Sequence, residues 1–247
     1  MRRLAIIAAL LGCAGCRSSG PAANDPVAHL FEDRYPDFVA AAGAHHAGCE
    51  VAIKAKGDAG TKHDDLTTSV DVDGNGNFRL VRDDGSELVQ VGLHAWTKTR
   101  DGHFEKIEAG SRADLERDAA VAEWRSVLEP MRDRIRLKKT GSKKLGSRPV
   151  ETWDLTIDAG DGNDAAAPKT EKGAGKVETD EATGFAVRVE LGGTWLATPP
   201  GGGGKVHYDL EKMSCAVTEL GSVKTIEAPG EEKATPAAKP TPAKKKK

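Results

Sequence analysis

Residues 67–108 decide the fold, and they read TTSVDVDGNGNFRLVRDDGSELVQVGLHAWTKTRDGHFEKIE. Apolar and polar residues alternate through this stretch, which is typical of half-buried β-strands. Turn sequences interrupt the alternation at 73–76 (DGNG), 83–86 (DDGS) and 100–103 (RDGH). Asp-Gly and Asn-Gly supply the positive φ angles that tight hairpins need. Together with the alternating segment at 50–56, the stretch predicts an antiparallel meander of about five strands.

The flanking sequence indicates an α+β fold that is mostly β. Residues 28–44 are typical of a short broken helix, because Pro36 interrupts them. Between 111 and 135 the apolar residues recur at helical spacing, and Pro130 is expected to kink or divide that helix. Alternation resumes at 152–158, 185–191, 206–210 and 216–226. We expect a curved antiparallel sheet, or incomplete β-barrel, covered by two or three helical segments.

The N-terminus has the features of an export signal. Two arginines precede an apolar run at 4–11, which is too short to span a bilayer as a helix. The run ends in Leu-Leu-Gly-Cys at 10–13, which resembles a bacterial lipobox and implies lipidation of Cys13. Cys16 is the alternative, although it lacks an aliphatic residue three positions earlier. We therefore expect a signal peptide at 1–12 and a flexible tether at 13–26.

Cys49 and Cys215 lie in strand-like segments of a chain that is predicted to be exported. An oxidising compartment permits a disulfide between them, and two unpaired buried thiols are the alternative. The sequence leaves this choice open.

The charge is distributed unevenly along the chain. It carries 36 basic and 38 acidic side chains, but the signal holds two arginines, and residues 231–247 hold six lysines and two glutamates. The remaining body therefore has 28 basic and 36 acidic side chains. We expect a disordered Lys/Pro/Ala-rich tail at 230–247 and a disordered, low-complexity insertion at about 159–183, within a single domain at 27–229.

The order of these features resembles the lipoprotein-carrier superfamily of LolA, LolB and the mycobacterial LppX and LprG lipoproteins. The resemblance covers residues 27–229 and includes the Gly-Ser-Arg-Pro-Val stretch at 146–150 and the closing Ile-Glu-Ala-Pro at 226–229. It implies an incomplete antiparallel barrel whose helices cover an apolar cavity. It also implies binding of acyl chains or a lipidated peptide without catalysis.

Two groups of apolar residues are the candidate lining of such a cavity, one in the meander and one in the predicted helix. They are Leu80, Val89, Val91, Leu93 and Trp96, and Val121, Trp124, Leu128, Met131 and Ile135. The alternative interpretation is that these side chains pack a filled core, because sequence cannot distinguish a filled interior from a cavity.

The sequence lacks the motifs of common catalytic and metal sites. It contains no G-x-S-x-G, H-E-x-x-H or P-loop pattern. Residues 71–76 resemble the start of a calcium loop, but Arg82 stands where a bidentate Glu is required. We therefore predict no enzyme activity, no metal and no cofactor.

The sequence predicts a cell-envelope lipoprotein with a non-catalytic half-barrel that binds a lipid or lipopeptide. The alternative is a structural or interaction lipoprotein of the outer membrane with a filled core and no ligand. In either case we expect a lipid anchor in the outer membrane, facing the periplasm. We expect a monomer that binds no nucleic acid.

Overall fold

We analysed a computed structural model, which describes residues 26–58, 60–99, 101–107, 111–159, 169–197 and 205–230. The predicted lipidation site and the tail after residue 230 lie outside these ranges, as do residues 160–168 of the predicted insertion. Within them the elements run α1 (Pro26–Phe31), α2 (Tyr35–Ala42), β1 (His45–Gly57), β2 (Gly60–Val72), β3 (Phe78–Arg82), β4 (Glu87–Val91), β5 (His94–Lys98) and β6 (Phe104–Ile107). They continue with α3 (Ser111–Val121), α4 (Trp124–Leu128), η3 (Glu129–Arg134), β7 (Ile135–Leu145), β8 (Arg148–Ile157), β9 (Lys169–Asp180), β10 (Ala186–Ala197) and β11 (Val206–Thr218).

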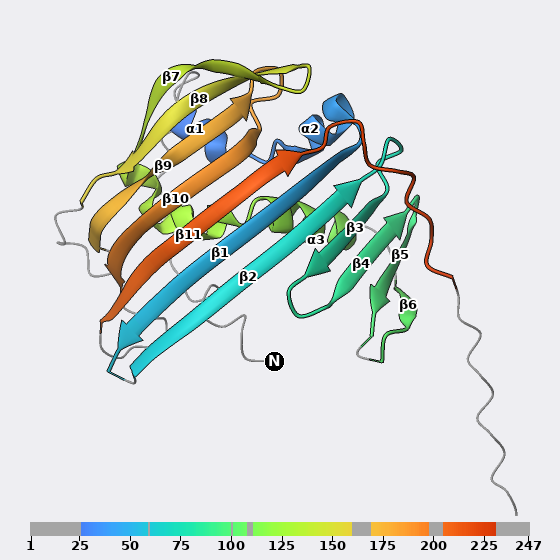
Figure 1. The fold of residues 1–247 in the computed structure, drawn as a ribbon, viewed down its shortest axis with the longest axis horizontal. Helices are drawn as coiled ribbons and strands as arrows, with labels where there is room; N and C mark the ends of the chain where they lie inside the picture. The colour runs from blue at the N-terminus through green and yellow to red at the C-terminus, as the bar shows by residue number, and fades with distance from the viewer. Residues whose placement is uncertain are drawn as a thin grey trace, which may run out of the picture.

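All eleven strands of the described residues form one antiparallel sheet. Its order is β6-β5-β4-β3-β2-β1-β11-β10-β9-β8-β7, so the two halves of the chain join where β11 pairs with β1. Figure 1 shows the helices together behind the sheet, on the face that we call concave. The expected fold class, a mostly β fold with an open curved sheet and few helices, is confirmed.

Strands β10 and β11 carry register irregularities at the same level of the sheet. The β1–β11 register shifts after Ala52, and the β10–β11 register shifts between Leu191 and Gly193. Such bulges bend a strand and increase its twist. On β9, a Cβ atom at Gly175 would lie 1.9 Å from the carbonyl oxygen of Glu190. The strands can therefore approach closely here only because this position has no side chain.

The core lies between the concave face and the helices. The helical stripe that begins at Val121 packs there, and Trp124, Leu128 and Met131 are at most 2% exposed. A second cluster surrounds Tyr35 and Phe38 of α2 near the upper ends of the strands. No helix among the described residues is long and apolar enough to cross a membrane.

Three details of the predicted elements were wrong. The segment between the turns at 83–86 and 100–103, expected to be one strand of the five-stranded meander, is a hairpin, because Gly92 adopts φ +57° and turns the chain between β4 and β5. The helical stripe stops before Ile135, which begins β7. Finally, Lys169–Asp180, within the insertion expected to be disordered, forms β9 and pairs with both β8 and β10.

Candidate functional site

The concave face carries an apolar surface that continues from the core to the lower rim of the sheet. Ile53 and the stacked pair Trp195 and Tyr208, whose ring centroids lie 5.9 Å apart, are buried on it. Two residues that border this surface are only partly buried, Leu66 on β2 opposite Val51 and Val206 at the lower end of β11. Strand alternation explains the pattern, because successive side chains on a strand point to opposite faces. The residues named here occupy the alternate positions of β1, β2, β10 and β11 that point to the concave side.

The predicted lining residues do not form one group. Leu80 and Val121 belong to the core cluster around α2, whereas Trp124, Leu128, Met131 and Ile135 belong to the cluster around the helical stripe. All six are 7% exposed or less. The structure therefore places them in packed core, with the helices against the sheet.

Four of the meander residues lie away from the concave core. Val89 and Trp96 are paired across β4 and β5 and point to the convex face, and Val91 lies on that side too. Leu93 is 90% exposed because it occupies the β4–β5 turn. Their assignment to a concave lining was wrong. The alternation of apolar and polar residues predicted that each strand has two faces, but it did not predict which face the helices would cover.

The two cysteines, whose pairing the sequence left open, are neighbours across β1 and β11. Cys49 is directly opposite Cys215, their Cα atoms lie 4.0 Å apart, and their sulfur atoms are bonded to each other. This bond crosses the junction between the N-terminal and C-terminal strands.

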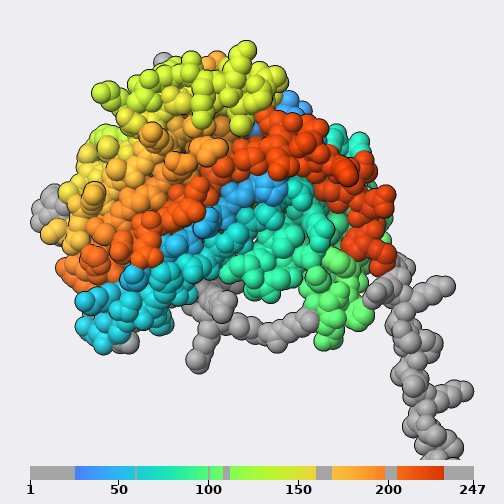
Figure 2. Space-filling view, viewed as in Figure 1, coloured from blue at the N-terminus to red at the C-terminus, as the bar shows by residue number. Residues whose placement is uncertain are grey.

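A C-terminal strap, residues 219–230, crosses the convex face. Figure 1 and Figure 2 show it running from the end of β11 over β1 and its neighbours toward β5, on the side opposite the helices. Asp73, which is 1% exposed, accepts a hydrogen bond of 2.9 Å from the main-chain N–H of Ile226. Its carboxylate also accepts bonds from the main-chain N–H groups of Asn75 and Asn77. Sequence could not predict this contact, because no local pattern links residue 73 with residue 226.

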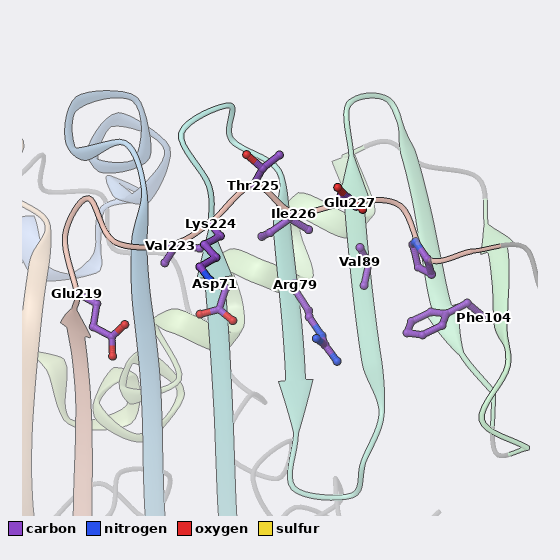
Figure 3. A pocket seen from close by; sticks show the side chains of 11 residues that line it. Asp71, Arg79, Val89, Phe104, Glu219, Val223, Lys224, Thr225, Ile226 and Glu227 are labelled. Atoms are coloured by element: carbon purple, nitrogen blue, oxygen red, sulfur yellow. The ribbon is translucent and has the colours of Figure 1, made fainter.

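A pocket of about 500 Å³ lies between the strap and the sheet. Figure 3 shows residues 223–227 above Asp71, Arg79, Val89 and Phe104, which project from β2, β3, β4 and β6. The pocket combines opposite charges with apolar walls, so its lining favours no single class of ligand.

A buried carboxylate stabilises the convex side of the small strands. Glu87 accepts hydrogen bonds from Arg79 at 2.6 Å and from Lys98 at 2.5 Å. Burial opposes its ionisation, but these bonds outweigh burial and hold the pKa of Glu87 below its ordinary value. Glu87 is therefore a buried carboxylate that bridges two cations, Arg79 and Lys98, on the neighbouring strands.

The described residues contain no group of three or more His, Cys, Asp or Glu side chains that could hold a metal ion. The acidic loop at 71–76 is the β2–β3 turn, and its Asp73 is occupied by main-chain N–H groups, as described above. The charged side chains of the long strands are mostly paired across the sheet, as in Lys143 with Glu178 at 2.7 Å.

Comparisons with known proteins give matches at the level of structure. No family model matches the chain, and no curated protein matches it in sequence. The chain is similar to the Mycobacterium tuberculosis lipoprotein LppX, with 15% identity, a TM-score of 0.31, and coverage of 77% of this chain and 95% of LppX. It is also similar to the LolA superfamily protein NE2245 from Nitrosomonas europaea, with 9% identity, a TM-score of 0.25, and coverage of 85% and 96%.

A third similar structure is MucB, from the Pseudomonas aeruginosa MucA/MucB complex. The identity is 15%, the TM-score is 0.26, and the match covers 80% of this chain but only 58% of the matched chain. Identities and TM-scores of this size do not assign a function. The open sheet with helices on one face is nevertheless the architecture that the resemblance to the lipoprotein-carrier superfamily implied.

Proposed function

We propose that this protein is a lipid-anchored cell-envelope protein that binds a lipid or a lipidated peptide on its concave face without catalysis. The observation that carries the proposal is that two partly buried apolar residues border the concave core: Leu66 at the edge of β2 and Val206 at the lower end of β11. A surface of this kind gains free energy by covering its apolar area, at roughly 25 cal/mol per Å². An acyl chain bound along this surface would cover that apolar area.

The lipobox at 10–13 supports placement in the envelope, with Cys13 as the acylated residue and Cys16 as the alternative. Acyl chains on the N-terminus would hold the globule at a membrane, because each buried methylene contributes about 0.8 kcal/mol. On this proposal the protein lies in the outer membrane and faces the periplasm.

The test compares two substitutions on neighbouring residues that face opposite sides of β2. Full-length protein is purified, and its non-covalently bound lipids are extracted and quantified by mass spectrometry. Leu66→Glu places a charge on the concave rim and is expected to reduce bound lipid severalfold. Thr67→Glu places the same charge on the convex face and is expected to leave bound lipid unchanged. Unmodified protein that is consistently free of lipid would contradict the proposal.

One observation favours a second candidate, a structural or interaction lipoprotein with a filled core. Four residues expected to line a cavity, Trp124, Leu128 and Met131 of the helical stripe and Ile135 at the start of β7, lie in the packed core and are at most 2% exposed. On this reading the concave side is closed, and lipid-free protein would be the result of the same extraction.

A further inference from the structure

The long strand β2 extends well beyond its shorter neighbour. β2 pairs with β1 from Gly60 to Val72, whereas its pairing with β3 begins only at Thr68. A hydrogen bond of 2.9 Å from the N–H of Asp83 to the carbonyl of Thr67 ends that ladder. Among the residues that the structure describes, no strand pairs with 60–66 on this side. Figure 1 shows the resulting step, where the lower half of β2 continues below β3 and β4.

The side chains along this open edge alternate in a self-complementary way. Lys62 and Asp64 point to the concave side, opposite Ala55 and Ile53 of β1. Within the described part of the chain, neither Lys62 nor Asp64 forms an ion pair. Asp64 is half-buried and Lys62 is exposed. An open edge with unpaired charges of both signs on one face can satisfy those charges by pairing with an edge of the same sequence.

In contrast to the monomer expected from the sequence, we infer that the edge at 60–66 is the docking surface for a second copy of this chain. An antiparallel pair related by a twofold axis through His63 places residue 60 opposite 66, 61 opposite 65, and 62 opposite 64. Residues that are directly opposite on one face of an antiparallel pair lie about 4.5–5.5 Å apart. Lys62 of each copy then faces Asp64 of the other, so two ion pairs form across the axis. The interface is isologous, as closed dimers require.

On the concave face, the charges of Lys62 and Asp64 also oppose the neighbouring registers. An axis through residue 62 would place Lys62 against Lys62, and an axis through residue 64 would place Asp64 against Asp64. Like charges directly opposite one another are destabilising. Charged side chains on an edge strand ordinarily discourage pairing with arbitrary strands. Here the charges of Lys62 and Asp64 oppose the two adjacent registers and favour the register whose axis passes through His63. Because the axis is perpendicular to the sheet, both concave faces lie on the same side of the joined sheets.

The first test is a cross-link at the axis. His63→Cys is made in the full chain with Cys13 and Cys16 replaced by Ser, and intermolecular disulfide formation is followed under mild oxidation. The control is Asp65→Cys, whose thiols would be four residues apart along the ladder, about 13 Å. We expect the His63→Cys chain to cross-link at least about tenfold faster, because a disulfide needs Cβ atoms about 4 Å apart. Equal rates, or no cross-link, would overturn the inference.

The second test reverses the charges. Lys62→Asp and Asp64→Lys each create like charges in both pairs, so each single variant should weaken self-association in sedimentation equilibrium over a concentration series. The double variant restores opposite charges and should return association to the level of the unmodified chain. This rescue separates the interface from damage to the fold. An unmodified chain that stays monomeric, or a double variant no better than the single ones, would contradict the inference.

Discussion

At the residue scale, His45 lies at the centre of a buried aromatic cluster. Its Nδ1 is 2.7 Å from the carbonyl of Gly43, to which it donates, so Nε2 accepts from the hydroxyl of Tyr35 at 2.9 Å. This network requires the neutral imidazole. Burial, aided by the positive charge of Arg117, holds the pKa of His45 below its ordinary value. A charged His45 would also leave the Tyr35 hydroxyl without its acceptor.

We predict that stability falls as the pH drops below about 6.5, the ordinary pKa of histidine in an unfolded chain. The unfolded state then binds a proton that the folded state resists, so the free energy of unfolding decreases by up to about 1.4 kcal/mol per pH unit. Urea denaturation at pH 7.5 and 5.5 measures this change. His45→Gln should show a smaller difference between the two pH values. His94→Gln, at an exposed position, should behave like the unmodified chain; an equal pH dependence in all three would contradict the role of His45.

Gly175 is a second residue on which the structure depends, because β9 and β10 approach each other closely where it has no Cβ atom. Its missing Cβ would lie 1.9 Å from the carbonyl oxygen of Glu190, which belongs to the backbone and cannot move aside cheaply. We predict that Gly175→Ala lowers the free energy of unfolding by about 1–3 kcal/mol or more, as overpacking does.

The matched control for Gly175→Ala is Gly74→Ala, since a Cβ at Gly74 would meet no atom within 4 Å. Gly74→Ala should change stability little. Thermal melting of both variants tests the comparison, and a Gly175→Ala chain as stable as the unmodified one would show that β9 and β10 do not need this close approach.

At the scale of elements, the strap is held by few contacts outside its own sequence. Besides the bond from Ile226 to Asp73, the N–H of Gly221 donates to the carbonyl of Ala44 at 2.7 Å, and Leu220 packs against the core cluster around α2. Burial opposes ionisation of Asp73, but its hydrogen bonds, that from Ile226 first among them, outweigh burial and lower its pKa. Asp73 is therefore a carboxylate that anchors the strap.

We predict that Asp73→Ala releases residues 222–230 from the convex face. The hydrogen bond to a charged group contributes about 1.5–3 kcal/mol, so its loss should raise amide exchange in the strap by at least about tenfold. Hydrogen–deuterium exchange with mass spectrometry measures this. Asp71→Ala removes a carboxylate that lines the same pocket but bonds to His46, so exchange in the strap should stay unchanged. Slow exchange in the Asp73→Ala chain would mean that apolar packing alone holds the strap.

The elements themselves show where local sequence is sufficient. The hairpin turns at 73–76 and 83–86 and the broken helix at 28–44 were predicted, because Gly and Pro act on their own backbone. The first half of β2 was not predicted, because residues 60–65 are polar and show no alternation. Pairing with β1 orders it: the long partner strand supplies a hydrogen-bonding ladder that polar side chains do not prevent. The same explanation applies to β9.

At the scale of the whole molecule, the proposed anchor decides where the concave face and the strap would act. We predict that Cys13→Ala abolishes incorporation of a labelled fatty acid and releases the protein from the membrane fraction, because no acyl chain remains to anchor it. Metabolic labelling followed by fractionation measures both effects. Cys16→Ala should retain the label. The reverse outcome would move the anchor to Cys16, and labelling of both variants would contradict a single acylated cysteine at either position.

Local sequence was sufficient to predict the mostly β class, the hairpin turns at 73–76 and 83–86 and the helical stripe from Val121 to Met131. These depend on periodicity and turn chemistry, which act within a few residues. Which face of the sheet the helices cover depends instead on tertiary contacts. Tertiary contacts also placed Val89 and Trp96 on the convex side, joined Asp73 to Ile226, and left the edge at 60–66 without a partner strand among the described residues. Each depends on contacts between residues far apart in the chain, and alternation along one strand specifies two faces without saying what will pack against either.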